Sequence, residues 1–412
     1  MILLLQDMIN LILIILIAGF IFEVILEYLN IKNWPLKMPA IANSIYSEEK
    51  YLKAREYAFV NYRFSQLTSI ISFVLLMIIL INGGFGWLDR IIRDYTSSPS
   101  LIAILFFGIL AIVSDLFSLP FAIYKTFVIE EKFGFNKTTV RTFMIDKVKG
   151  YLLMIVFGSI VITALVQVFE ITGKNFWWIA WSFLTLLMML ITVFYTTWIL
   201  PLFNKLTPLT EGPLRSAIHD YSIKNNFPLK DIFVIDGSKR SSKANAFFSG
   251  LGKRKKIVLY DTLISEHSTE ELVAVLAHET GHYKLKHTRT SFIAGILQTG
   301  FMLFVFSLLQ GNAALIEALG ASQSGLHLEL FGFALLYSPV SIVTGILMHL
   351  LSRKNEYEAD SFAKNTYDAR SLVSALIKLS ADNLSNLTPH PAYVFVHYSH
   401  PPLLKRLEAL GE

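Results

Sequence analysis

Long runs of apolar residues without charge constrain this chain more than any other feature. Seven stretches reach the roughly 20 mainly apolar residues that a helix needs to cross a bilayer. They lie near residues 8–28, 66–86, 101–124, 150–170, 176–203, 289–310 and 330–352. Because a helix satisfies its own backbone hydrogen bonds in lipid, the pattern predicts a multi-pass membrane protein built from seven spanning helices.

Composition agrees with a lipid-bilayer environment and excludes several classes of site. Of the 412 residues, 54% are hydrophobic and 16% are charged, and the net charge is +5. The basic residues cluster in alternate loops without interleaved aromatics, so no nucleic-acid partner is expected. The chain contains no cysteine. Any metal must therefore be held by His, Asp or Glu.

The distribution of Lys and Arg predicts the orientation. Basic residues gather after the first, third and fifth apolar stretches and in the C-terminal tail, whereas residues 311–329 contain neither Lys nor Arg. Positive loops stay in the cytosol, so the N-terminus is predicted outside and the C-terminus inside. The membrane is expected to be either a bacterial inner membrane or the endoplasmic reticulum.

The apolar pattern divides the chain into four parts. They are an N-terminal membrane domain with five spans (1–203), a metallopeptidase segment (204–288), spans six and seven (289–352), and a C-terminal part of the catalytic domain (353–412).

Local signals predict the structure of the 204–288 segment. The runs 232–235 and 257–260 are typical of strands; the second is either an edge strand that pairs with an extended substrate or a buried core strand. Ser268 and Glu271 form a capping box. This box predicts a helix that runs to about Lys286.

The pentapeptide His278-Glu279-Thr280-Gly281-His282 lies on this helix. Residues i and i+4 share one helix face, so both imidazoles can bind one ion. Glu279 then lies beside the ion, where it can act as the general base. The motif predicts one Zn²⁺ per chain, held by His278 and His282.

A catalytic zinc takes three protein ligands and a water molecule. His287 is one residue out of register for a third histidine ligand, so it is not expected to bind the metal. Glu356 and Asp360 share a helix face, and they are predicted to bind the metal and to orient a ligand histidine, respectively. Glu358 points elsewhere and is expected to be a solvated surface charge.

Other ionisable residues lead to further expectations. Glu23 and Asp115 lie in predicted spans, where such groups usually face a bundle interior or a water-filled cavity; Glu23 could equally sit at a frayed helix end. His327 has no partner at ligand spacing and is expected on the surface or in a loop. The mixed-charge segment 48–63 is expected to lie along the membrane face.

Several segments beyond the zinc motif form a wider pattern. They are 129–137 (IEEKFGFNK), 201–205 (PLFNK), 242–247 (SKANAF), 356–360 (EYEAD) and 397–402 (HYSHPP). With the zinc motif, they resemble the integral-membrane CAAX prenyl endopeptidases, the type I zinc CAAX proteases, over nearly the whole chain.

The resemblance implies an all-α multi-pass membrane protein, with seven transmembrane helices around a water-filled chamber and a small α+β, zincin-like catalytic domain on the cytosolic side. It implies that His278, His282 and Glu356 bind zinc and that Glu279 activates water. It also implies that Asn245 and His400 line the catalytic site.

The predicted function is that of a zinc metalloendopeptidase that hydrolyses a bond near the C-terminus of a prenylated or hydrophobic peptide or protein. A quality-control protease of broad substrate range shares the same zinc chemistry and stays open as an alternative. A membrane transporter in which residues 278–282 are structural would leave the spacing of Glu356 and Asp360 unexplained.

Overall fold

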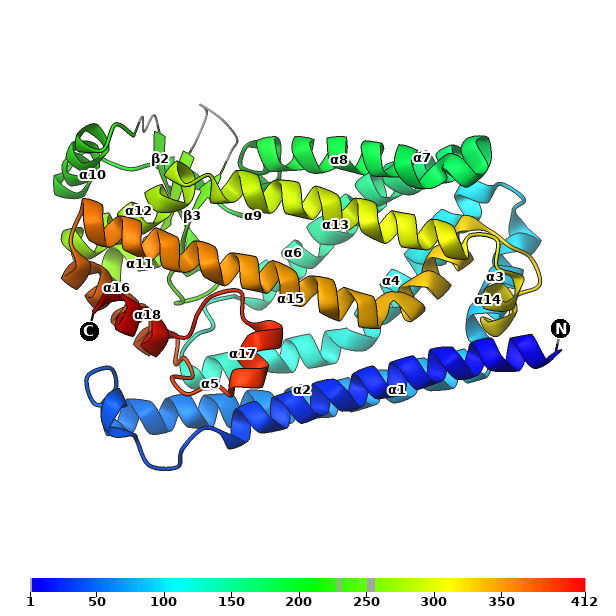
Figure 1. Ribbon diagram of the computed structural model, residues 1–412, viewed down its shortest axis with the longest axis horizontal. Helices are drawn as coiled ribbons and strands as arrows, with labels where there is room; N and C mark the ends of the chain where they lie inside the picture. The colour runs from blue at the N-terminus through cyan, green and yellow to red at the C-terminus, as the bar shows by residue number, and fades with distance from the viewer. Residues whose placement is uncertain (1, 228–230, 250–255, 412) are drawn as a thin grey trace.

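The long helices of the protein run side by side between two ends of the molecule (Figure 1). The computed structural model describes residues 2–227, 231–249 and 256–411. Helix α12 (Thr269–Lys284), which carries the His-Glu-x-x-His motif, lies at one end with the strands. The N-terminus lies at the opposite end (Figure 1).

Six helical segments of the described chain are long and apolar enough to cross a membrane. They are Asp7–Lys32, Glu48–Ile81, Pro99–Phe133, Val140–Phe203, His287–Leu309 and Leu326–Thr366. The 64-residue segment Val140–Phe203 contains two of the predicted spans, because the chain reverses at the short 3-10 turn Gly173–Asn175. Gly173 has a φ of 49°, a backbone angle that favours glycine. Five of the seven predicted apolar stretches therefore fall within these helical segments, whereas the stretch 66–86 extends beyond Ile81 into the next helix and the stretch 289–310 ends one residue beyond Leu309.

These segments consist of helices joined in places by π-helical turns. The membrane helices are α1 (Ile2–Lys32), α2 (Glu48–Ile81), α4 (Pro99–Tyr124), α5 (Glu131–Phe133), α6 (Val140–Leu153), α7 (Ser159–Thr172), α8 (Phe176–Phe194), α9 (Leu200–Phe203), α13 (His287–Leu309) and α15 (Leu326–Thr366). The π-helical turns are Lys125–Glu130, Met154–Gly158 and Tyr195–Ile199.

The bundle is loosely packed. In the most apolar window of each segment, only 6–17% of the residues are buried. Such low burial fits helices that contact lipid on one side and an open interior on the other. A cavity of about 840 Å³ lies between α1, α2 and α15, and most of the residues that line it are apolar.

Helix α15 connects the bundle to the catalytic end. It has 41 residues and so extends about 60 Å at 1.5 Å per residue. A helix of this length crosses the bilayer and continues well beyond it. Its final turns pack against α12 at the catalytic end (Figure 1).

A four-stranded sheet supports α12. The strands are β1 (Leu206–Pro208), β2 (Asp231–Ile235), β3 (Ala246–Ser249) and β4 (Lys256–Tyr260), in the order β1-β2-β4-β3. Strand β4 pairs in parallel with β2 and antiparallel with β3, and Ile257, Val258 and Leu259 are buried. The expectation of an edge strand at 257–260 is therefore wrong, and the alternative of a core strand is correct. The edge strands of this sheet are β1 and β3.

Helices from three parts of the chain cover the sheet and α12. They are α10 (Pro213–Lys224), α11 (Asp261–Glu266), α16 (Ala369–Asp382) and α18 (Leu403–Leu410), with the short α17 (Pro391–His397) nearby. Their apolar faces form one core with α12, which includes Ile218, Leu263, Leu276 and Leu372. The segments before and after the last two spans thus fold into one unit.

Helices α3 (Gly84–Tyr95) and α14 (Ala313–Ala318) lie at the far end of the bundle (Figure 1). There His327 is buried, and its Nε2 lies 2.7 Å from Asp89 Oδ1. Arg93 donates to the same carboxylate. The expectation that His327 lies on the surface is therefore wrong; the local spacing gave no sign of Asp89, which is distant in sequence.

Two other expectations concern charged residues. Both intramembrane acids have partners: Asp115 pairs with Lys147, and Glu23 lies 3.1 Å from His397. The segment 48–63 is the start of the continuous helix α2. The expectation that it lies along the membrane face as a separate helix is wrong, because the same helix continues into the span.

The far end should be intolerant of side chains at Gly86. A Cβ there would lie 2.0 Å from the backbone of Gly320, so Gly86→Ala must push α3 away from the loop before α15. We expect a destabilisation at or above the upper end of the about 1–3 kcal/mol typical of overpacking, measured as thermal unfolding in detergent. Gly108→Ala in α4, where a Cβ meets nothing within 4 Å, is the control; equal melting temperatures for both variants would contradict this account.

Candidate active site

The N-terminus of α12 is fixed by its capping box. Glu271 N–H donates to Ser268 Oγ (3.2 Å), and Ser268 N–H donates to Glu271 Oε2 (3.0 Å). Glu271 also accepts hydrogen bonds from Ser374 and Lys378 of α16. The predicted helix is confirmed, and it ends at Lys284. Its first turn is thereby tied to the C-terminal part of the chain.

Gly281 lets α12 and α15 approach closely. A Cβ at Gly281 would lie 3.0 Å from Ala359 Cα and 3.1 Å from Phe362 Cβ. Such distances are shorter than ordinary van der Waals contact, so a side chain at this position would push the helices apart. The absence of one brings Glu356 of α15 to the face of α12 that carries His278 and His282.

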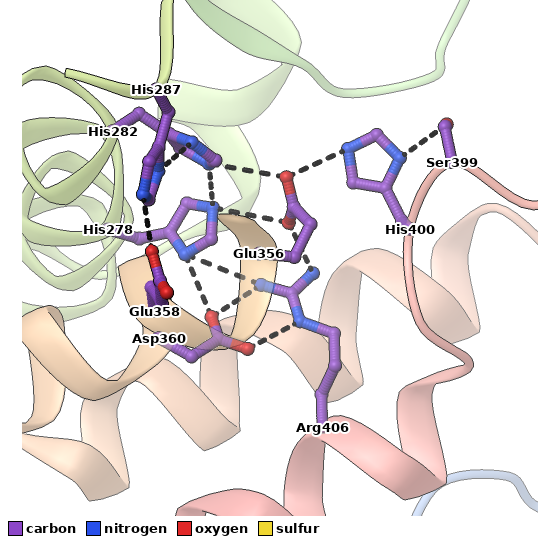
Figure 2. A network of polar contacts seen from close by, with 9 residues as sticks. All are labelled: His278, His282, His287, Glu356, Glu358, Asp360, Ser399, His400 and Arg406. Carbon is purple, nitrogen blue, oxygen red and sulfur yellow. Dashed lines mark hydrogen bonds and ion pairs between the residues drawn. The ribbon is translucent and has the colours of Figure 1, made fainter. Parts of the chain in front are cut away.

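Three potential ligand atoms meet at this helix contact. His282 Nε2 lies 3.2 Å from Glu356 Oε1, and His278 Nε2 lies 3.5 Å from Glu356 Oε2. The two Nε2 atoms lie 3.2 Å apart (Figure 2). One atom from each of the three residues can be chosen so that all lie within 4.8 Å of one another. Two imidazole nitrogens and one carboxylate oxygen form a donor set that suits zinc.

The polar environment of these atoms fits a bound cation. Glu356 Oε2 is buried and has no hydrogen-bond partner among the described residues. Burial alone would lower the pKa of His278, but the neighbouring Asp360 and Glu356 carboxylates, which favour the protonated ring, outweigh burial and raise the pKa to about 9. Carboxylates thus favour positive charge at the imidazole, and a metal ion can take the place of the proton there.

Asp360 lies behind His278, as predicted from its spacing. Its Oδ1 is 2.8 Å from His278 Nδ1, which leaves Nε2 for a metal. Arg406 of α18 donates two hydrogen bonds to the same carboxylate, at 2.6 and 2.8 Å (Figure 2). Such contacts to the far nitrogen set the tautomer and orientation of a ligand histidine. Arg406 gave no sequence signal, because no periodicity links α18 to α15.

Glu279, the residue after His278 on α12, lines a pocket that the ligand candidate His282 also borders. The pocket has a volume of about 280 Å³ and is lined also by Phe247, His282 and Asn355. Burial raises the pKa of the Glu279 carboxyl, and the nearby His278 and His282 oppose this rise. A carboxylate with a raised pKa is suited to exchange protons near neutral pH.

His400 lies beside the Glu356 carboxylate. Its Nε2 is 3.4 Å from Glu356 Oε1, and its Nδ1 is 3.0 Å from Ser399 Oγ (Figure 2). The side chain is 64% exposed, and partial desolvation by the surrounding protein lowers its pKa; in the neutral form, one ring nitrogen carries a hydrogen that it can donate.

Asn245 immediately precedes the edge strand β3. Its Oδ1 accepts from Ala246 N–H (2.8 Å), and its backbone carbonyl accepts from Tyr260 N–H (3.1 Å). The nearby Phe247 lines the Glu279 pocket. No described residue accepts a hydrogen bond from the Nδ2 group of Asn245 in this arrangement.

Lys243 ties the Asn245 segment to the membrane helices. Its Nζ lies 3.0 Å from Tyr57 Oη of α2 and 3.4 Å from Glu130, and Tyr57 donates to Glu130 (2.7 Å). Ser242 N–H donates to the carbonyl of Phe135 (3.1 Å). The segments 129–137 and 242–247, distant in sequence, therefore meet in space.

His287 and Glu358 have roles that the spacing argument missed. As expected, His287 is not among the three clustered donors, but it is buried and its Nδ1 lies 3.1 Å from His282 Nδ1. Its Nε2 lies 2.9 Å from Glu358 Oε2 (Figure 2). The expectation that Glu358 is only a solvated charge is therefore wrong. The contact arises because α13 folds back over the last turn of α12.

Comparison with known proteins assigns the family. Residues 27–205 match the family described as CAAX prenyl protease N-terminal, five membrane helices, and residues 208–412 match peptidase family M48. The chain belongs to peptidase family M48. It is therefore a membrane metalloendopeptidase, and this family membership does not favour the transporter alternative.

Curated relatives and a solved structure agree over almost the full length. The chain is 37% identical to CAAX prenyl protease 1 homolog from Oryza sativa subsp. japonica, with 96% of this chain and 95% of that protein covered. It is 34% identical to CAAX prenyl protease 1 from Saccharomyces cerevisiae, with 96% and 93% covered. The crystal structure of S. mikatae Ste24p matches with a TM-score of 0.92 and 34% identity, covering 98% of this chain and 99% of that one.

The contact between His278 and Asp360 should support metal affinity. Asp360→Asn weakens the acceptor for His278 Nδ1–H and disrupts the pair with Arg406, so we expect a loss of about 10–100-fold in zinc affinity. Competition with a fluorescent chelator measures it. Glu408→Gln removes an exposed α18 carboxylate whose one ion pair within the described part of the chain is with Lys405, so it should leave the affinity unchanged; equal effects of the two substitutions would contradict the role of Asp360.

Proposed function

We propose that this M48 chain is a zinc-dependent endopeptidase that cleaves a bond near the C-terminus of prenylated or hydrophobic peptides. His278, His282 and Glu356 would hold one Zn²⁺, with Glu279 as the general base. The observation that carries this proposal is the meeting of the three ligand atoms within 4.8 Å, with Glu279 on the next position of the same helix.

The residues around the metal position divide the chemistry between them. Zinc bound there supplies a water of lowered pKa and polarises the scissile carbonyl. Glu279 takes the proton of the attacking water and later passes it to the leaving amine. Its buried position raises its pKa, which makes it a stronger base and so favours the first of these two proton transfers. Asp360 and Arg406 keep His278 in the ligating tautomer.

We propose that His400 and Asn245 bind charge that develops during the reaction. The neutral His400 can donate from Nε2 toward the face of Glu356 that borders the metal position. Asn245 uses its Oδ1 within its own turn, which leaves Nδ2–H as a donor for substrate. Fixed donors aimed at a tetrahedral oxyanion stabilise the transition state more than the ground state.

Among the described residues, β3 has no partner strand on one of its edges, and an extended peptide could bind there. Strand β3 pairs with β4 on one side and is the last strand of the sheet. An extended peptide that adds to such an edge gains main-chain hydrogen bonds. Because Phe247 of β3 also borders the Glu279 pocket, a peptide on this edge would pass beside the base.

The cavity between α1, α2 and α15 supports a substrate with a hydrophobic group. Its volume of about 840 Å³ lies within the range of ligand pockets, roughly 300–1,000 Å³. Phe20, Phe73 and Ile342 are among its apolar residues, and Glu23 lines it and contacts His397. His397 is close in sequence to His400, so the cavity adjoins the segment that reaches the site. The relatives from Oryza sativa subsp. japonica and Saccharomyces cerevisiae are named CAAX prenyl proteases, which agrees with a prenylated substrate.

We further propose that the catalytic end faces the cytosol and that the chain divides at 1–203, 204–288, 289–352 and 353–412. The orientation follows from the basic loops and from the opposite positions of the N-terminus and α12 in Figure 1. On this division, two membrane spans separate the two parts of one catalytic unit.

Replacement of the general base should separate catalysis from metal binding. We expect Glu279→Gln to keep one zinc per chain and to lower the cleavage rate of a farnesylated CAAX peptide by about 10²–10⁴-fold. The rate is measured with purified protein, and a chelator should abolish wild-type cleavage. If wild-type protein holds zinc but cuts neither the farnesylated nor the unmodified peptide, the proposed substrate class is wrong. If wild-type protein contains no zinc, the proposed metal site is wrong.

The absence of cysteine allows a direct test of orientation. In cells, the single-cysteine variant Lys224→Cys on α10 should react with a membrane-impermeant maleimide only after the cytosolic side is made accessible. Ser322→Cys, in the loop without Lys or Arg, should react from outside. Both positions are exposed, and the reverse labelling pattern would contradict the proposed orientation.

A further inference from the structure

Four side chains form a continuous line of polar contacts that starts at Glu356 and passes through His282. The Nε2 of His282 faces Glu356, whereas its Nδ1 lies 3.1 Å from His287 Nδ1. The other nitrogen of His287 lies 2.9 Å from Glu358 Oε2 (Figure 2). His287 is only 4% exposed. The line thus runs from Glu356 through His282 and His287 to Glu358.

Hydrogen-bond chemistry allows one useful arrangement of hydrogens along this line. A histidine that offers the Nε2 lone pair to a metal carries its hydrogen on Nδ1. Only one hydrogen can lie between the two facing Nδ1 atoms, so His287 Nδ1 must accept and the hydrogen of His287 must reside on Nε2. Glu358 is the acceptor that holds it there.

The opposite arrangement would block metal binding. If His287 carried its hydrogen on Nδ1, it would donate to His282 Nδ1. The hydrogen of a neutral His282 would then lie on Nε2, pointing toward Glu356. The tautomer of His287 therefore decides whether His282 can act as a ligand.

The backbone between α12 and α13 is built to make this contact. Lys286 has a φ of 62°, a left-handed conformation that is uncommon for a residue with a side chain. This turn ends α12 and starts α13 at His287, so His287 folds back over the last turn of α12. The two imidazole rings lie edge to face, with centroids 5.1 Å apart.

Glu358 reaches the line from the helix that also carries Glu356. Two residues along a helix differ by about 200° around its axis, so Glu358 cannot contact the same atoms as Glu356. His287 bridges this gap, with Glu358 on the far side of the ligand histidines from Glu356 (Figure 2). The only other ion-pair partner of Glu358 among the described residues is the exposed Lys354, at 3.7 Å.

We propose that His287 and Glu358 are positioning residues that hold His282 in the metal-ligating tautomer. This inference rests on the proposed zinc site. The two ligand histidines are then held in different ways: His278 contacts the carboxylate of Asp360 directly, whereas His282 reaches the carboxylate of Glu358 through a second imidazole.

Two substitutions at His287 in the full-length protein distinguish hydrogen bonding from packing. In His287→Phe, the phenyl ring fills the space of the imidazole but cannot accept a hydrogen bond from His282. We therefore expect the zinc affinity to fall by about 10–100-fold. His287→Gln can accept from His282 with its carbonyl oxygen and donate to Glu358 with its amide, so it should retain affinity within about threefold of wild type. The readout is the zinc dissociation constant from chelator competition, beside thermal unfolding of each variant.

A double-mutant cycle tests whether Glu358 acts through His287. Glu358→Leu alone should weaken zinc binding, whereas in the His287→Phe background it should have no further effect. Lys354→Met, which removes the other partner of Glu358, should leave zinc affinity unchanged. The inference is overturned if His287→Phe binds zinc as wild type does, or if the effects of the two substitutions simply add. A wild-type protein without zinc would instead overturn the proposed function.

Discussion

The close contact of α12 with α15 at Gly281 is the constraint on which the site depends. The ligand histidines and Glu356 lie on different helices, and an apolar span, α13, separates them in sequence. Only a helix pair without a side chain at the crossing point lets Glu356 come within 3.2 Å of His282. The fold of the catalytic end, from the sheet to α18, holds these two helices together.

Charge at this contact favours a bound cation. The carboxylates of Glu356 and Asp360 lie beside the single guanidinium of Arg406 (Figure 2). Uncompensated charge is costly in a buried site. A cation held by the two histidines and Glu356 would offset the excess of negative charge. The same carboxylates that raise the pKa of His278 in favour of a proton therefore favour a metal in its place.

Local patterns in the sequence predicted much of the fold and part of the site. The apolar stretches and the capping box of α12 depend only on residues close together in the chain, so they could be identified from the sequence alone. The pairing of His278 with His282, and of Glu356 with Asp360, follows from helical spacing. The resemblance to a family added Asn245 and His400, which have no spacing signal, and their roles remain predictions.

The remaining features depend on contacts between distant segments. No periodic pattern in the chain indicates the contacts of Arg406 or the pairing of Asp89 with His327. Nor does any pattern indicate that β4 lies inside the sheet while β3 lies at an edge. The expectation that Glu358 is a solvated charge was wrong because it considered only which face of its own helix Glu358 shares with Glu356. The partner of Glu358, His287, comes from α13. The sequence shows that His287 is out of register for a ligand, but not that it folds back onto His282.

The central claim is that His278, His282 and Glu356 hold one zinc ion with a position left for water. X-ray absorption at the zinc edge of the purified protein tests it most directly. The account predicts one zinc per chain with only nitrogen and oxygen ligands near 2.0–2.1 Å, about four in number, and scattering from two imidazoles. A fit that requires three imidazoles, or protein that contains no zinc, would contradict it.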